Sequence, residues 1–270
     1  MKSKQLPDPI RGAFSRRGLL KGAAVAAMAR SATGQVAGEV AETDASSGQR
    51  FLAYIGTYTG AIGAGGNGLG IYLYSMNASN GRLSLIKVVS QVSNPSWIAL
   101  DPSRTHLYAV NEVANFNGTS GSVSSFLVNR SNGDLVFLNA VSSEGGGPAH
   151  LSVDPSGKFV FVANYGGGSI AALPILEDGS LGPATDIQQD IDSLGPKNAT
   201  NAPPGSFAIS GHEAPNAHMI QADPGGKFVL QTDLAQDRIY VYSFDTSAGK
   251  LTPASVPFVS LPPGDGPRHF

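Results

Sequence analysis

Three of the five histidines each end a four-residue phrase that recurs along this chain, and a Trp ends its first copy. The phrase reads Asn-Pro-Ser-Trp at 94–97, Gly-Pro-Ala-His at 147–150, Pro-Asn-Ala-His at 215–218 and Gly-Pro-Arg-His at 266–269. Its final residues, Trp97, His150, His218 and His269, are 53, 68 and 51 residues apart. Imidazole moves protons near neutral pH, and the guanidinium of Arg268 is shaped to hold an anion. The phrase therefore predicts a site in which successive repeats contribute acid–base and anion-binding groups.

Carboxylates stand at the ends of strands that follow the phrase. Glu112 comes after the apolar run 106–111, and Asp233 ends the run that begins at Phe228. A carboxylate beside an imidazole can accept a proton or orient its neighbour. We expect both side chains near the histidines. The Asp-Pro turns at Asp101, Asp154 and Asp223 recur after each phrase, and we interpret these three aspartates as structural turn residues.

The elements that must position these groups are strands. The apolar runs 51–57, 70–76, 83–89, 106–111 and 159–164 favour strands, and turns such as Asn80-Gly81 and Asn132-Gly133 predict hairpins. Asp178-Gly179 places another fourth strand at Ser180-Leu181. Four-stranded units with a period near 50 residues indicate an all-β fold, a β-propeller of four-stranded blades. In a propeller, equivalent positions converge around one axis, which brings the phrase residues together.

About four to five blades are represented. The first predicted strand, 51–57, matches the second strand of later units, so the chain begins one strand into a unit. It ends at Phe270, one residue after the fourth copy of the phrase. We therefore expect a C-terminally truncated form of a longer propeller. Residues 188–215 form a longer connection that leads into Asn216, and we expect a surface loop there.

Composition agrees with an all-β domain rich in tight turns. The chain has 270 residues, with 34 Gly, 18 Pro and 14% charged residues. The net charge of −2 provides no basic surface for nucleic acid. There is no Cys, which excludes disulfides, thiolate metal sites and a Cys nucleophile.

The N-terminal segment is typical of an export signal. Paired Arg16-Arg17 precede Leu-Leu-Lys and a short apolar stretch at 22–29, which resembles a bacterial twin-arginine signal. That stretch is much shorter than the roughly 20 residues of a membrane span. We expect residues 1–45 to be signal and linker, residues 46–270 to form the propeller domain, and the product to be periplasmic or secreted through the twin-arginine machinery.

The order and spacing of these phrases resemble the seven-bladed propeller lactonases, a family that includes 6-phosphogluconolactonase of the propeller type and carboxy-cis,cis-muconate cyclase. Supporting phrases are Tyr54–Thr59, Tyr108–Glu112 and Leu234–Tyr242, and the resemblance covers residues 51–270. It implies a small-molecule lactone substrate and no cofactor or metal. We expect a monomer with no membrane span and no nucleic-acid partner.

The resemblance also implies roles for individual residues. Lactone hydrolysis needs a base that activates water and a group that holds the carbonyl oxygen as it becomes negative. His218 or Glu112 would be the base, Arg268 the clamp for the oxyanion or a substrate carboxylate, His150 a substrate-positioning group, and Asp233 the residue that orients a His or the water. Substrate-binding contacts would come from His269, Trp97 and Asn216, with Trp97 as an aromatic wall.

Other interpretations of the same residues remain open. A His at a strand start can be a hydrogen-bonded structural group, as in other propellers. A muconate-type lactonizing cycloisomerase would use the same cleft without net use of water. An exported propeller that only binds its ligand would need none of the chemistry. The glycine-rich run 63–70 joins two strands and lacks the helix that a dinucleotide site requires.

Overall fold

The computed structural model describes residues 51–60, 66–191, 193–195 and 213–270. The expected signal and linker, 1–45, and most of the expected loop at 188–215 lie outside the described residues. The described part contains strands, turns and loops and no helix, so it offers no helical segment able to cross a bilayer.

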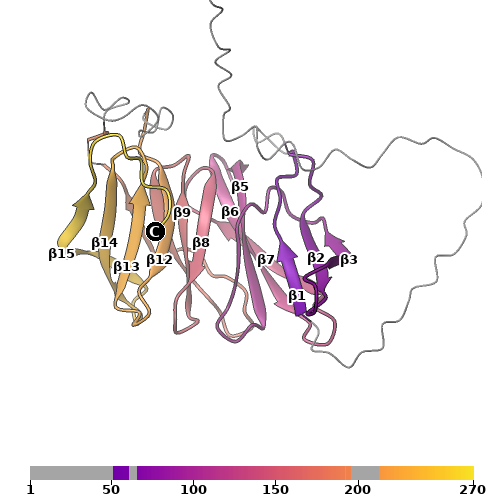
Figure 1. Cartoon of the computed structure of the whole chain (residues 1–270). Coiled ribbons are helices and arrows are strands. Elements are labelled where there is room, and N and C mark those ends of the chain that lie inside the picture. Colours follow the sequence, from indigo (N-terminus) through magenta and orange to yellow (C-terminus); the bar gives the residue numbers. More distant parts are fainter. Residues whose placement is uncertain (1–50, 61–65, 192, 196–212) are drawn as a thin grey trace, which may run out of the picture. The chain divides into compact units, whose positions relative to one another are not determined.

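Fifteen strands of the described residues form four antiparallel sheets. They are β1 (Phe51–Ile55), β2 (Ile71–Met76), β3 (Leu83–Val89), β4 (Ile98–Leu100), β5 (His106–Phe116), β6 (Ser120–Val128), β7 (Leu135–Ser142), β8 (Pro148–Val153), β9 (Phe159–Asn164), β10 (Ser169–Pro174), β11 (Asp186–Gln189), β12 (Ala217–Ala222), β13 (Phe228–Asp233), β14 (Arg238–Asp245) and β15 (Lys250–Ser260). Each sheet contains strands consecutive in the chain, as Figure 1 shows from indigo β1 to yellow β15. This meander of four-stranded blades confirms the predicted all-β propeller fold.

The first sheet has three strands, β1–β3, whereas the other three sheets have four. This agrees with a first strand that matches the second strand of later units. The strands at 70–76 and 83–89 were predicted within one residue of β2 and β3.

One predicted strand is wrong. Ser180-Leu181 makes only an isolated bridge, Ile175 to Leu181, and the fourth strand of the third sheet, β11, begins at Asp186. The turn at Asp178 is held by its own carboxylate, which accepts hydrogen bonds from the amide and hydroxyl of Ser180 at 3.0 and 2.6 Å. Pro183 follows and has no N–H for a ladder, so regular pairing starts beyond it.

Apolar cores fill the spaces between successive sheets. Leu107 and Phe126 of the second sheet pack with Ile71 of the first. On its opposite face the second sheet contributes Tyr108 and Val123, which pack with the third sheet. The side chains of each blade thus alternate between two neighbours, as the period of two in a strand requires.

The Asp-Pro turns are structural, as predicted. Asp154 is buried, and its Oδ1 accepts hydrogen bonds from the backbone N–H groups of Lys158 and Phe159 at 2.8 and 2.7 Å. Asp101 and Asp223 accept the equivalent bonds in their own sheets. Each carboxylate closes the turn between the first and second strands of its blade.

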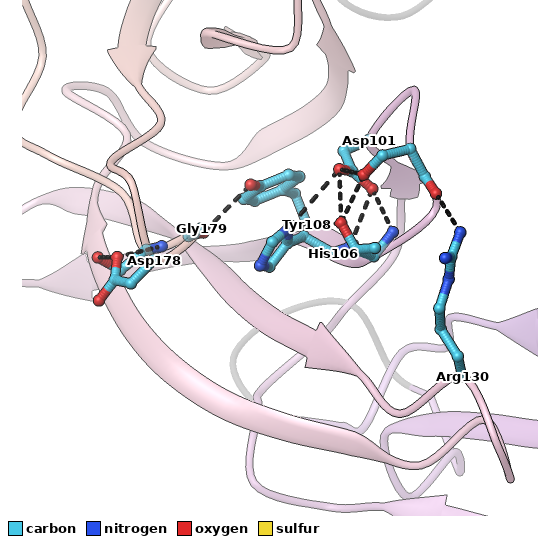
Figure 2. A network of polar contacts seen from close by, with 9 residues as sticks. Asp101, His106, Tyr108, Arg130, Asp178 and Gly179 are labelled. Atoms are coloured by element: carbon cyan, nitrogen blue, oxygen red, sulfur yellow. Dashed lines mark hydrogen bonds and ion pairs between the residues drawn. The ribbon is translucent and has the colours of Figure 1, made fainter.

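The hairpin of one sheet docks on the sheet before it. The hydroxyl of Tyr54 donates to the carbonyl of Gly133 at 2.6 Å, and Tyr108 donates to Gly179 at 3.1 Å. Figure 2 shows Tyr108 and His106 beside the hairpin residue Gly179. In the next pair of sheets the donor is Thr185, whose hydroxyl bonds the carbonyl of Gly249 at 2.8 Å.

Candidate active site

The four final residues of the repeated phrase meet, as the sequence predicts. Trp97 precedes β4, His150 lies on β8, His218 on β12 and His269 in the segment after β15. The Trp97 ring centroid lies 4.3 Å from that of His150 and 6.0 Å from that of His269. The His269 ring meets His218 edge to face at 4.9 Å. Because equivalent positions of successive blades converge, one aromatic and three imidazole rings from three sheets and the C-terminal segment form one cluster.

Two of the imidazoles are buried and uncharged. Burial lowers the pKa of His150 to about 3, and the neighbouring charge of His269 acts in the same direction. Burial also lowers the pKa of His218 to about 3, with smaller contributions from Arg268, His269 and His150. The backbone N–H of Ile220 donates to Nδ1 of His150 at 3.4 Å, which places the proton of that neutral ring on Nε2. Both rings therefore act as neutral hydrogen-bonding groups.

His269 and Arg268 end the cluster at an exposed position. Burial, and then the charge of Arg268, lower the pKa of His269. The Arg268 side chain is exposed, while its backbone carbonyl accepts a hydrogen bond from the hydroxyl of Thr232 at 3.1 Å. The positive charge of Arg268 acts on His218, His269 and Tyr58. The guanidinium is thus the cation of this site among the described residues.

Glu112 is held by two hydroxyl groups from other segments. Its Oε2 accepts hydrogen bonds from the hydroxyls of Tyr58 and Ser96, both at 2.6 Å. Sequence reasoning identified Glu112 but gave no role to Tyr58 or Ser96. No local pattern marks Tyr58 because its contact joins residues 54 positions apart.

Asp233 differs from Glu112 in register and surroundings. Asp233 pairs with Ala217 in the register in which Asn164 of the preceding sheet pairs with Pro148. Glu112 lies one residue further along the equivalent strand of its own sheet. The buried carboxylate of Asp233 accepts backbone N–H bonds from Asn216, Ala235 and Gln236 at 2.8 to 2.9 Å. Burial raises the pKa of Asp233, whereas hydrogen bonds with Asp190 and with these backbone amides act to lower it. Asp233 therefore supports the chain that leads into His218, and a catalytic role for it stays a prediction.

Asn216 connects two neighbouring sheets beneath the cluster. Its Nδ2 donates to the carbonyl of Tyr165 at 2.8 Å, and the Tyr165 ring meets His218 edge to face at 5.7 Å. The side chain is 8% exposed. This amide positions His218 through Tyr165, and the expected substrate contact of Asn216 stays a prediction.

No group of three or more His, Asp or Glu side chains that could hold a metal occurs among the described residues. Two surface cavities, of about 460 and 270 Å³, lie along the second sheet and share Gln91 and Phe137 in their walls. Neither is lined by the imidazole cluster. The second cavity has only uncharged walls, which include Asn111, Ser122 and Ser124.

Comparisons with known proteins agree with this geometry. The chain is 30% identical over 221 residues to a 6-phosphogluconolactonase of Bacillus subtilis, covering 82% of this chain and 56% of that protein. A 6-phosphogluconolactonase of Formosa agariphila is 26% identical, over 75% of this chain and 54% of its own length. The structure of a periplasmic gluconolactonase from Pseudomonas aeruginosa matches with a TM-score of 0.68 and 28% identity, covering 82% of this chain and 58% of that one.

The chain thus spans a little more than half the length of each of these relatives. The family description "Lactonase, 7-bladed beta-propeller" matches residues 52–270. Together with the four-stranded blades and the converging phrase residues, this match shows that the chain belongs to the seven-bladed β-propeller lactonase family.

Proposed function

We propose that this protein hydrolyses the lactone of a sugar acid. The observation that carries the proposal is the cluster in which a Trp and three imidazoles from successive repeats meet next to an exposed arginine. Hydrolysis of a lactone needs a base for water and a cation or donors for the developing oxyanion. Family membership supports the same chemistry.

The electrostatics of the cluster support a division of labour. Arg268 carries the charge that would hold the oxyanion or a substrate anion, since His150 and His218 are neutral at physiological pH. An imidazole with a pKa of about 3 is a weak base at neutral pH, which favours Glu112 over His218 for activating water. His150 and His218 would donate hydrogen bonds to the substrate, and Trp97 would cover its ring.

Activity on a panel of lactones tests the proposal. We expect base consumption above the spontaneous rate with glucono-δ-lactone, 6-phosphogluconolactone or both. Arg268→Ala should lower kcat/KM by about 100-fold or more, since it removes the oxyanion clamp. Arg130→Ala is a matched control, because the Arg130 guanidinium bonds only the carbonyl of Ser103 among its described contacts.

Two outcomes would contradict the proposal. Full activity in both Arg268→Ala and His218→Ala would place the chemistry elsewhere. A product without oxygen from labelled solvent water would favour the cycloisomerase. Comparing the phosphorylated with the unphosphorylated lactone identifies the substrate class.

We also propose that the protein is exported. The paired Arg16-Arg17 and the short apolar stretch at 22–29 support this, and one matched structure is that of a periplasmic gluconolactonase. A periplasmic location would expose the site to unphosphorylated sugar lactones.

A further inference from the structure

One oxygen of Glu112 receives two hydroxyl protons. Tyr58, which follows β1, and Ser96, which precedes β4, both donate to Oε2 at 2.6 Å. The donors come from two connecting segments, so Glu112 joins three segments at one point. Within the described residues, no hydrogen bond reaches the other oxygen, Oε1. This asymmetry leaves one oxygen anchored and the other available.

The backbone around these donors is fixed by Asn94. Its buried side-chain Oδ1 accepts hydrogen bonds from the N–H of Thr59 at 2.9 Å and from the Thr59 hydroxyl at 3.2 Å. Its Nδ2 donates to the carbonyl of Glu112 at 3.1 Å, and its own carbonyl accepts from the N–H of Ser96 at 2.7 Å. The side chain and backbone carbonyl of this one asparagine therefore set the positions of Thr59, Ser96 and Glu112.

Tyr58 is exposed and feels the charge of the site arginine. Its side chain is 39% exposed, and the charge of Arg268 acts on it. Burial and the hydrogen bond to Glu112 raise the pKa of Tyr58 to about 12, so its hydroxyl remains a proton donor at physiological pH. The other ionisable groups of the site are His150 on β8, His218 on β12, and His269 in the segment after β15.

We propose that Tyr58 is a positioning residue for the proposed hydrolysis: together with Ser96 it binds Oε2 of Glu112 and turns Oε1 toward the water that attacks the lactone. This proposal rests on the proposed function, in which Glu112 is the base. The water gives its proton to Glu112 as its oxygen bonds the carbonyl carbon. That proton then passes to the ring oxygen as the ring bond breaks.

Replacing Tyr58 with Phe removes one hydroxyl and keeps the ring. Without the Tyr58 hydroxyl only Ser96 still binds Oε2, so Oε1 should no longer be held toward the attacking water. We expect kcat to fall with KM little changed, because the binding groups stay in place.

Carboxyl ¹³C NMR of glutamate-labelled protein, recorded at one fixed pH, reads the lost hydrogen bond as a shift of the Glu112 resonance without an activity assay, with Glu112→Gln to assign that resonance. Tyr72→Phe is the matched control: the Tyr72 hydroxyl accepts only from the N–H of Leu69 among its described contacts. Ser96→Ala tests the second donor if Tyr58→Phe does not fold, and Ser96→Thr, which keeps the hydroxyl, should restore the resonance position.

The outcomes separate the two proposals. If the protein hydrolyses no lactone but Tyr58→Phe still shifts the Glu112 carboxyl resonance, the function fails and the hold on the carboxylate stands. An unchanged Glu112 resonance in both Tyr58→Phe and Ser96→Ala overturns the positioning role, whatever the activity.

Discussion

At the scale of single residues, burial determines how the repeated histidines can act. His150 and His218 lie in apolar surroundings where the charged imidazolium is unfavourable, and both pKa values fall to about 3. A sequence shows that a His recurs but not how deeply it is buried. The ionic groups of the site are therefore Arg268 and Glu112. The imidazoles of His150 and His218 act as uncharged, directional hydrogen-bonding groups.

The lowered pKa values predict that stability falls in mild acid. The unfolded chain binds a proton at each His near pH 6.5, whereas the folded protein binds it only near pH 3. The unfolded state thus holds more protons between these values, so the free energy of unfolding rises with pH across the window and is lost as pH falls below 6.5. Each His should cost about 2 kcal/mol between pH 7 and pH 5.

Urea unfolding at pH 7 and pH 5 measures this loss. His150→Asn and His218→Asn should each reduce the difference in unfolding free energy between pH 7 and pH 5 by the contribution of one His. This should hold even if both variants are less stable at pH 7. A difference equal to that of the unaltered protein in both variants would mean that neither imidazole is protonated on unfolding.

At the scale of elements, a repeated contact joins each blade to the next. The hairpin glycines Gly133, Gly179 and Gly249 each lie against the preceding sheet, with φ between 64° and 82°. At Gly179 the neighbour is the ring of His106, whose Nδ1 lies 3.6 Å from the Asp101 carboxylate (Figure 2). The Asp178-Gly179 dipeptide predicts the turn glycine. Its hydrogen bond with Tyr108 was not predictable, since the two residues are 71 positions apart.

Gly179→Ala should destabilise the fold by about 2–4 kcal/mol. The added methyl group would collide with the His106 ring, and the positive φ of 82° is unfavourable for alanine. Gly81→Ala is the matched control, with a φ of 71° at the same hairpin position and nothing within 4 Å of the new methyl group. It should cost only the backbone term, about 1 kcal/mol. Equal losses in chemical denaturation would show that the hairpin contact contributes nothing.

At the scale of the whole molecule, the fold was more predictable than the site. The phrase and its spacing depend on local turns and strand periodicity, so they indicated four-stranded blades and the meeting of Trp97, His150, His218 and His269. The predicted fourth strand directly after Asp178 was wrong, because a turn and Pro183 delay the pairing. The role of Tyr58 was not predicted, because packing between sheets brings it to Glu112. Contacts distant in sequence leave no periodic signal.

The paired arginines near the N-terminus predict where the molecule works. Twin-arginine export carries proteins that are already folded, and this fold suits it, because its docked hairpins join segments 64 to 79 residues apart. The given sequence has no Cys, so these residues form no disulfide in any compartment. Replacing Arg16 and Arg17 with Lys should retain the protein in the cytoplasm of a bacterial host, as measured by fractionation and immunoblotting. Arg11→Lys, a nearby single arginine, should leave export unchanged. If the paired variant reached the periplasm at the level of the unaltered protein, the export route proposed here would be wrong, and cytoplasmic phosphorylated lactones would become the better substrates to test.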